Sequence, residues 1–144
     1  MHEVDQAVAC FAKGFNCSQA VLSACGSKFG LDQDTALKVA GAFGGGMARM
    51  GETCGAVTGA FMVIGLKHSK IKQGDDAARE KTYEVVEEFV SRFKSRNSSI
   101  VCRDLLGCDL SKPGGLQTAK EKELFTTICP KFVKDATEII GELL

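Results

Sequence analysis

The chain lacks several features that would place it in a common class of protein. Lysine plus arginine total 18 and aspartate plus glutamate total 18 among 144 residues, so no excess charge favours binding to nucleic acid or acidic lipid. It has no run of about 18 apolar residues that could span a membrane. Its polar first residues lack the basic-then-apolar order of a signal peptide. We therefore expect a cytoplasmic protein that binds no nucleic acid and is not an integral membrane protein.

The sequence also lacks the compact motifs of several kinds of site. There is no Cys-x-x-Cys pair, which excludes a locally encoded thioredoxin-like dithiol, and no Cys-x-x-Cys-His segment for covalent haem attachment. The glycine run at residues 44–46 lacks the Gly-Lys-Ser/Thr ending of a phosphate-binding loop, so we interpret it as a tight corner. The two histidines, His2 and His68, lie among polar residues and are predicted to be surface residues rather than metal ligands.

Cysteine, in contrast, is abundant. The chain has seven, whereas an extracellular disulfide scaffold is expected to have an even number, a signal peptide and a small loop-rich fold. We therefore expect reduced thiols, some of which are redox-active or bind a metal. Cys10 and Cys25 fall within apolar helical patterns and are predicted to be core residues.

The apolar pattern is helical through most of the chain, and no segment alternates as a strand does. With 44% apolar residues and no evident linker, residues 1–144 are expected to form a single domain. The segment 54–66 carries no charge, and its Gly55 and Gly59 lie on one helical face. We predict an all-α fold, a single compact helical bundle around this buried glycine-rich central helix. The bare face of Gly55 and Gly59 would admit another backbone or bind a cofactor.

Four cysteines share one predicted property, a place at the N-terminus of a helix. Free backbone N–H groups and the helix dipole favour an anion there, so the thiol pKa is expected to fall from about 8.5 towards neutrality. A lowered pKa yields the thiolate that attacks disulfides and binds metals. These cysteines are Cys17 after the N-cap Asn16, Cys54 after the N-cap Thr53, Cys102 in the first turn after Ser99, and Cys129 as the N-cap before Pro130.

Three functions are compatible with this pattern. The first is thiol–disulfide chemistry, as in an oxidoreductase, with Cys54 as the nucleophile and a second cysteine resolving it; Cys108 offers a nearby partner for Cys102. The second is an electron-transfer or sensing protein whose four cysteines hold an iron–sulfur cluster or, less favoured by the spacing, zinc. The third is a non-catalytic helical adaptor with inert cysteines.

The segment Cys54-Gly-Ala-Val-Thr-Gly59 resembles the signature of the C_GCAxxG_C_C family of small redox-active proteins. In that family a leading cysteine and two further cysteines accompany the segment, and Cys17, Cys102 and Cys129 match them. The resemblance covers nearly the whole chain. It implies redox activity, an unidentified redox partner and an association with a transport system, since such proteins are often encoded near transporters. A related domain of some multihaem cytochromes is associated with an iron–sulfur centre, which keeps this cofactor among the candidates.

Overall fold

The computed structural model describes residues 2–144 and confirms the all-α prediction. Within that range there is no strand, and the only β-type pairing is an isolated antiparallel bridge between Thr53 and Val101. The helices are α1 (His2–Ala12), α2 (Cys17–Gly26), the 3₁₀ helix η1 (Ser27–Phe29), α3 (Gln33–Val39), α4 (Gly44–Met47), α5 (Gly55–His68), α6 (Asp76–Asn97), α7 (Cys102–Leu106), α8 (Pro113–Glu121), α9 (Leu124–Thr127) and α10 (Cys129–Leu143).

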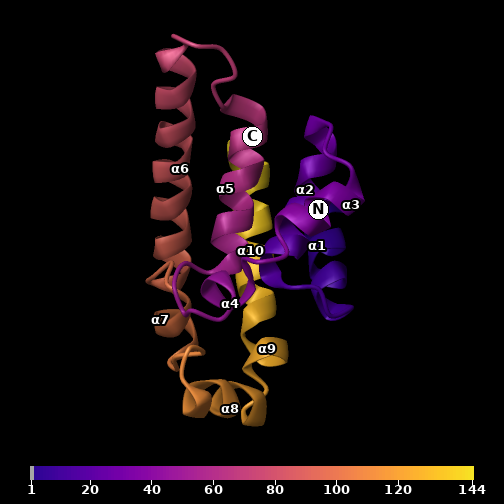
Figure 1. Cartoon of the computed structure of the whole chain (residues 1–144), viewed down its shortest axis with the longest axis vertical. Coiled ribbons are helices and arrows are strands. Elements are labelled where there is room, and N and C mark those ends of the chain that lie inside the picture. Colours follow the sequence, from indigo (N-terminus) through magenta and orange to yellow (C-terminus); the bar gives the residue numbers. More distant parts are fainter. Residues whose placement is uncertain (1) are drawn as a thin grey trace.

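The glycine-rich helix α5 lies at the centre of the bundle. It packs against α2, α6 and α10, with α6 along one side and the α1–α3 group on the other (Figure 1). The short helices α7, α8 and α9 form the lower end of the molecule in this view. As a result, the N-terminal ends of α5 and α10 both lie between the main bundle and the short helices.

The bare face of α5 is covered by α2. A Cβ atom added to Gly59 would lie 2.9 Å from the carbonyl oxygen of Ser18 and 3.2 Å from its Cα. Gly55 is similarly close to α2, since an added Cβ would lie 3.1 Å from the backbone nitrogen of Ser18. Of the two roles predicted for Gly55 and Gly59, the structure therefore shows the close approach of another backbone. The expectation of an open glycine face for a cofactor is wrong for Gly59.

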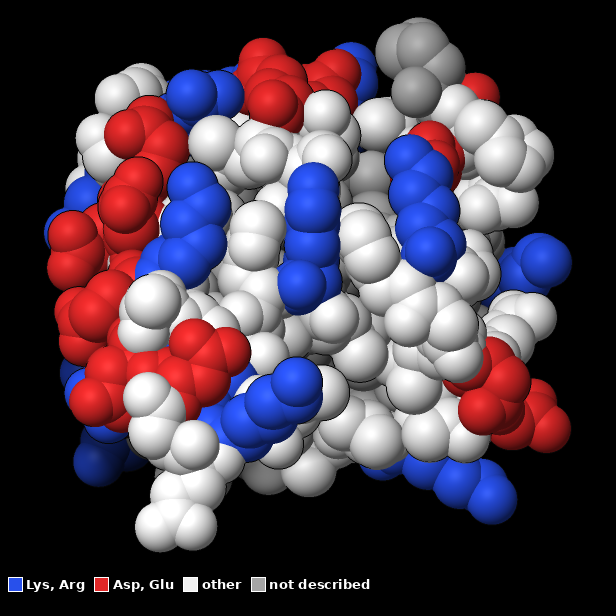
Figure 2. Space-filling model, turned by 90° about the horizontal axis from the view of Figure 1, so that it is seen from above, with Lys and Arg blue, Asp and Glu red and all other residues white. Residues whose placement is uncertain are grey.

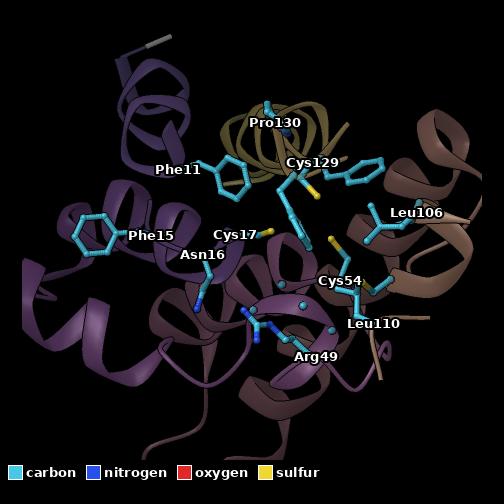
Figure 3. A pocket seen from close by; sticks show the side chains of 18 of the residues that line it. Phe11, Phe15, Asn16, Cys17, Arg49, Cys54, Leu106, Leu110, Cys129 and Pro130 are labelled. Atoms are coloured by element: carbon cyan, nitrogen blue, oxygen red, sulfur yellow. The ribbon is translucent and has the colours of Figure 1, made fainter. Parts of the chain in front are cut away.

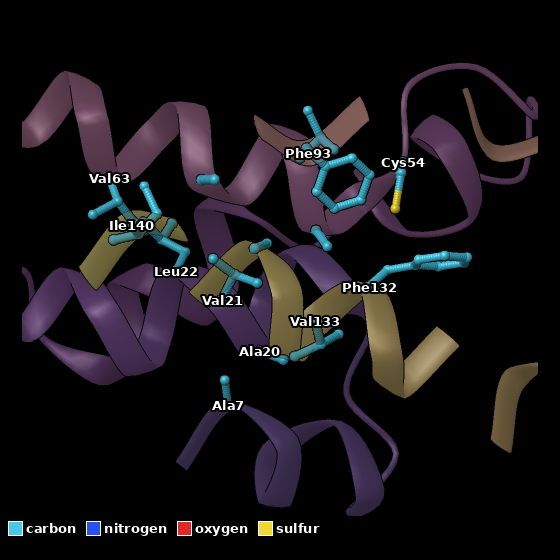
Figure 4. Close-up of a cluster of buried hydrophobic side chains, with 14 of the residues drawn as sticks. Ala7, Ala20, Val21, Leu22, Cys54, Val63, Phe93, Phe132, Val133 and Ile140 are labelled. Atoms are coloured by element: carbon cyan, nitrogen blue, oxygen red, sulfur yellow. The ribbon is translucent and has the colours of Figure 1, made fainter. Parts of the chain in front are cut away.

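Aromatic rings join α5, α6 and α10 in the core. The ring centroids of Phe61 and Phe89 are 6.1 Å apart, those of Phe89 and Phe93 are 5.9 Å apart, and those of Phe93 and Phe132 are 6.3 Å apart. Cys54 lies at the edge of this core, on the side of Phe93 and Phe132 (Figure 4). The core thus ends at the residue that begins the central helix.

Charged side chains of both signs lie on the face shown in Figure 2. Lysine and arginine are separated there by uncharged residues, and acidic side chains gather on the side where α6 lies. Among residues 2–144, no helix combines the length and the apolar character needed to cross a membrane.

Candidate functional site

An open cavity of about 830 Å³ lies where the N-terminal ends of four helices meet. All four cysteines that were predicted at helix starts line it, and the sulfur atoms of Cys17, Cys54 and Cys129 point towards its centre (Figure 3). Cys17, Cys102 and Cys129 are the first residues of α2, α7 and α10, and Cys54 is the N-cap of α5. The prediction that these residues begin helices is confirmed. Thr53, the predicted N-cap of α5, instead pairs with Val101.

The capping box predicted before Cys17 is present. The Asn16 side chain accepts a hydrogen bond of 2.9 Å from the N–H of Gln19, and the Gln19 side chain accepts one of 2.9 Å from the N–H of Asn16. The Asn16 amide group also donates to the carbonyl of Gly41, at 3.1 Å. These three bonds fix the first turn of α2 and therefore the position of Cys17.

A short backbone pairing places Cys54 beside Cys102. The N–H of Cys54 donates to the carbonyl of Ile100 at 2.8 Å, and the N–H of Cys102 donates to the carbonyl of Glu52 at 2.6 Å. The bridge between Thr53 and Val101 lies between these two bonds. Residues almost 50 positions apart in the sequence are therefore joined by the main chain, and the Arg103 side chain adds bonds to the carbonyl of Gly51 and the carboxylate of Glu52.

Glycines allow the cysteine-bearing segments to approach one another. An added Cβ at Gly46 would lie 2.7 Å from the Cβ of Cys102, and one at Gly55 would lie 3.2 Å from the Cβ of Cys17. An added Cβ at Gly44 would lie 2.4 Å from the Cβ of Asn16. Contacts this short exclude a side chain at Gly44 and Gly46 unless the backbone moves. The glycine run is therefore a tight corner, as predicted, and it packs against Cys102 and against Asn16, the residue before Cys17.

The turn that follows is left-handed over five consecutive residues. The φ angles run from +51° to +69° at Gly45, Gly46, Met47, Ala48 and Arg49. For a residue with a Cβ atom this conformation costs roughly 1–2 kcal/mol. Three such residues in a row are uncommon, and strained backbone of this kind clusters at functional sites. Here the strained turn forms one wall of the cavity.

Cys17 and Cys129 interact directly. The neighbouring Cys17 thiol lowers the pKa of Cys129 despite the opposing effect of burial. The interaction with Cys129, together with burial, holds the pKa of Cys17 well above its ordinary value. Of the two thiols, Cys129 is therefore the one that ionises more readily.

Cys54 and Cys102 have no comparable partner and remain protonated. Burial raises the pKa of Cys54 to about 11, although the N–H groups of Ala56 and Val57 act in the opposite direction. Burial, followed by the nearby charge of Cys54, raises the pKa of Cys102 to about 12. The prediction that a helix start lowers the pKa of these two thiols is wrong. The helix-start effect is present at Cys54 but is smaller than the cost of burying a charge.

The sequence model of the C_GCAxxG_C_C family, described as "Putative redox-active protein (C_GCAxxG_C_C)", matches residues 15–143. The chain belongs to this family. Its redox character therefore has support independent of the geometry of the cavity. No curated protein and no solved structure matches the chain.

The three other cysteines of this C_GCAxxG_C_C protein do not line the cavity. Cys25 is buried, as predicted, and burial raises its pKa to about 12. Cys10 was also predicted to be a core residue but is only half-buried, 3.7 Å from the hydroxyl of Ser23. Cys108 is half-buried and close enough to Cys102 to contribute to the rise in its pKa.

The alternative role of the four cysteines is to bind a metal, and a single ion and a cluster make different demands on them. The four are Cys17, Cys54, Cys102 and Cys129. Among residues 2–144, no three His, Cys, Asp or Glu side chains are arranged to ligate a single metal ion. A site for one zinc ion is therefore not supported by this arrangement. An iron–sulfur cluster spreads its thiolate ligands around a multi-atom core, and four cysteines around one cavity are the ligand set that it requires.

Sequence reasoning missed the wall opposite the thiols. Arg49 lines the cavity and was not singled out, because nothing in the pattern of residues 47–51 predicts a left-handed turn. The apolar residues Phe11, Leu110 and Phe125 also line it, although their spacing indicates only helix or loop. The signal that could have drawn attention to Arg49 was its position three residues after a run of three glycines.

Proposed function

We propose that this protein carries out thiol–disulfide exchange through a pair formed by Cys17 and Cys129. The observation that supports the pair most strongly is that both sulfur atoms point into one cavity, where the neighbouring Cys17 thiol lowers the pKa of Cys129. A thiolate is the attacking species in disulfide exchange, and its partner must be close enough to resolve the mixed disulfide. Cys54, first considered as the nucleophile, suits this role less well because its pKa is about 11.

The exchange proceeds in two steps. The Cys129 thiolate attacks one sulfur of a disulfide R–S–S–R, the S–S bond breaks, and R–S⁻ leaves as the mixed disulfide forms. Cys17 gives its proton to this R–S⁻ and attacks the Sγ of Cys129, which releases a second R–S⁻ that takes a proton from solvent. The protein is oxidised from two thiols to one disulfide, and the substrate is reduced to two thiols. A dithiol that supplies two electrons reverses the reaction.

The test is to identify which disulfide forms first. Reduced protein would be exposed to a small disulfide without oxygen, quenched with acid at several times and analysed by peptide mapping. We expect the Cys17–Cys129 disulfide to appear first, and Cys129→Ser to abolish it. Cys10→Ser, a matched change of a half-buried thiol outside the cavity, should leave its rate unchanged. A disulfide between Cys54 and Cys102 formed first, or thiols lost singly, would contradict the proposal.

A second candidate function is supported by the presence of four cysteines on one cavity. Cys17, Cys54, Cys102 and Cys129 are the residues that would hold an iron–sulfur cluster, whose chemistry would be one-electron transfer. Anaerobic purification followed by iron and sulfide analysis distinguishes the two functions. Stoichiometric iron and sulfide that are lost in Cys54→Ser would favour the cluster, whereas a colourless protein that loses thiols in pairs would favour exchange.

A further inference from the structure

The wall opposite the thiol pair carries an unpaired positive charge. Arg49 is the only charged residue among the described residues that line the cavity, and it makes no ion pair or side-chain hydrogen bond within residues 2–144. The other arginines of the chain, by contrast, all have acidic partners: Arg79, Arg92, Arg96 and Arg103. In Figure 3 the guanidinium group points towards the side of the cavity where Asn16 lies. Because Arg49 is exposed and lines the cavity that holds the thiols, its guanidinium group is available to bind an anionic ligand that enters the cavity.

The glycine run holds this arginine at the cavity. Gly45 lines the cavity and contacts Arg49, since an added Cβ at Gly45 would lie 2.9 Å from the arginine Cγ. The position of the Arg49 side chain therefore depends on the absence of a side chain at Gly45.

The rest of the cavity is apolar and exceeds the space needed by the thiols alone. Its volume of about 830 Å³ falls within the range of small-molecule sites. Aromatic and aliphatic side chains contribute most of the remaining lining; they include Phe11, Phe15, Leu106, Leu110 and Phe125. Buried apolar walls with a few fixed polar groups are typical of a site that holds an organic molecule in one orientation.

We infer that the substrate of the Cys17–Cys129 pair is a small organic disulfide with an apolar body and a carboxylate-type anionic group. Arg49 binds the anionic group, and the apolar walls hold the body. The disulfide is thereby presented to the sulfur of Cys129. This inference rests on the proposed thiol–disulfide exchange and adds the chemical class of the substrate. Arg49 acts here as a binding and specificity residue.

Two aromatic disulfides that differ in charge test the inference. The probes are 5,5′-dithiobis(2-nitrobenzoate), which carries carboxylates, and the neutral 4,4′-dithiodipyridine. The rate of Cys129 modification by each would be measured by quenching and peptide mapping. We expect Arg49→Gln to slow the reaction with the carboxylate probe about tenfold, the loss of one charge-assisted contact, and to leave the neutral probe within twofold. Arg49→Lys should retain part of the rate.

The control is Arg79→Gln, which removes an equal charge from α6, away from the cavity, and should change neither rate. Equal slowing of both probes by Arg49→Gln would show a general loss of structure or reactivity and overturn the inference. An unchanged rate with the carboxylate probe would overturn it as well. If wild-type Cys129 and Cys17 react with neither probe, the proposed exchange itself fails, and that result is distinct from a failure of anion binding.

Discussion

On one side of the cavity, Cys17 and Cys129 begin α2 and α10 and shift each other's pKa; on the other, Cys54 and Cys102 begin α5 and α7 and are governed by burial. All four thiols have the same kind of place in the secondary structure. Only Cys129 has a lowered pKa, because of the neighbouring Cys17 thiol. Burial raises the pKa of Cys54 and Cys102, and the interaction with Cys129, followed by burial, raises that of Cys17. The comparison shows that a helix start does not by itself produce a thiolate when the sulfur is buried.

The largest expected effect is a loss of stability on adding a side chain at Gly46, which packs against Cys102. Gly46→Ala would place a Cβ atom 2.6 Å from the backbone nitrogen of Glu52 and 2.7 Å from the Cβ of Cys102, at a φ of +69°. We expect the free energy of unfolding to fall by about 3–4 kcal/mol, since overpacking adds to left-handed strain. Chemical denaturation would measure this change.

Gly74→Ala is the matched control for Gly46→Ala. Gly74 has a φ of +86°, but an added Cβ would have no neighbour within 4 Å, so only the strain of about 1–2 kcal/mol should appear. Equal losses for Gly46→Ala and Gly74→Ala would mean that close packing against Cys102 contributes nothing to stability.

A smaller effect on the free energy of unfolding is expected at alkaline pH, from the buried and protonated thiol of Cys54. An unfolded thiol ionises near pH 9, whereas Cys54 in the folded protein ionises near pH 11, so the unfolded chain loses this proton first. The free energy of unfolding should therefore fall between pH 9 and 11, with Cys54 responsible for about 2–3 kcal/mol of the loss. Cys54→Ala should reduce the slope of stability against pH over that range, measured by urea denaturation.

The control for the alkaline effect is Cys10→Ala, which removes a half-buried thiol outside the cavity and should keep the wild-type slope. If Cys54→Ala and the wild type lose stability in parallel above pH 9, the buried Cys54 thiol is not the group that titrates.

The smallest expected effect is on the pKa of Cys129, when its neighbour Cys17 is replaced. Cys17→Ala removes the thiol that lowers the pKa of Cys129, so the pKa of Cys129 should rise. Cys17→Ser keeps an O–H donor and should give a smaller rise. The pH dependence of Cys129 alkylation, followed by peptide mapping, measures the shift. An unchanged midpoint in both variants would assign the low pKa of Cys129 to the start of α10 instead.

The sequence was sufficient to identify the four cysteines and the helices that carry them. Local rules apply to each: Asn16 and Gln19 form a capping box from their spacing alone, and Pro130 opens α10 because it has no N–H to satisfy. The match of residues 15–143 to the family agrees with this assignment. Local patterns also predicted that Gly55 and Gly59 leave a bare face on the central helix. Local patterns did not decide whether α2 or a bound group covers this bare face of the central helix.

Only the tertiary structure decided how the thiols differ. A pKa depends on burial and on neighbours that are distant in the sequence, and Cys17 and Cys129 are 112 positions apart in the numbering. The left-handed turn that brings Arg49 to the cavity is likewise fixed by packing, because Met47, Ala48 and Arg49 have no intrinsic preference for positive φ. Local sequence thus determined which thiols begin helices, and long-range packing determined which of them has a lowered pKa and which cation lines the same cavity.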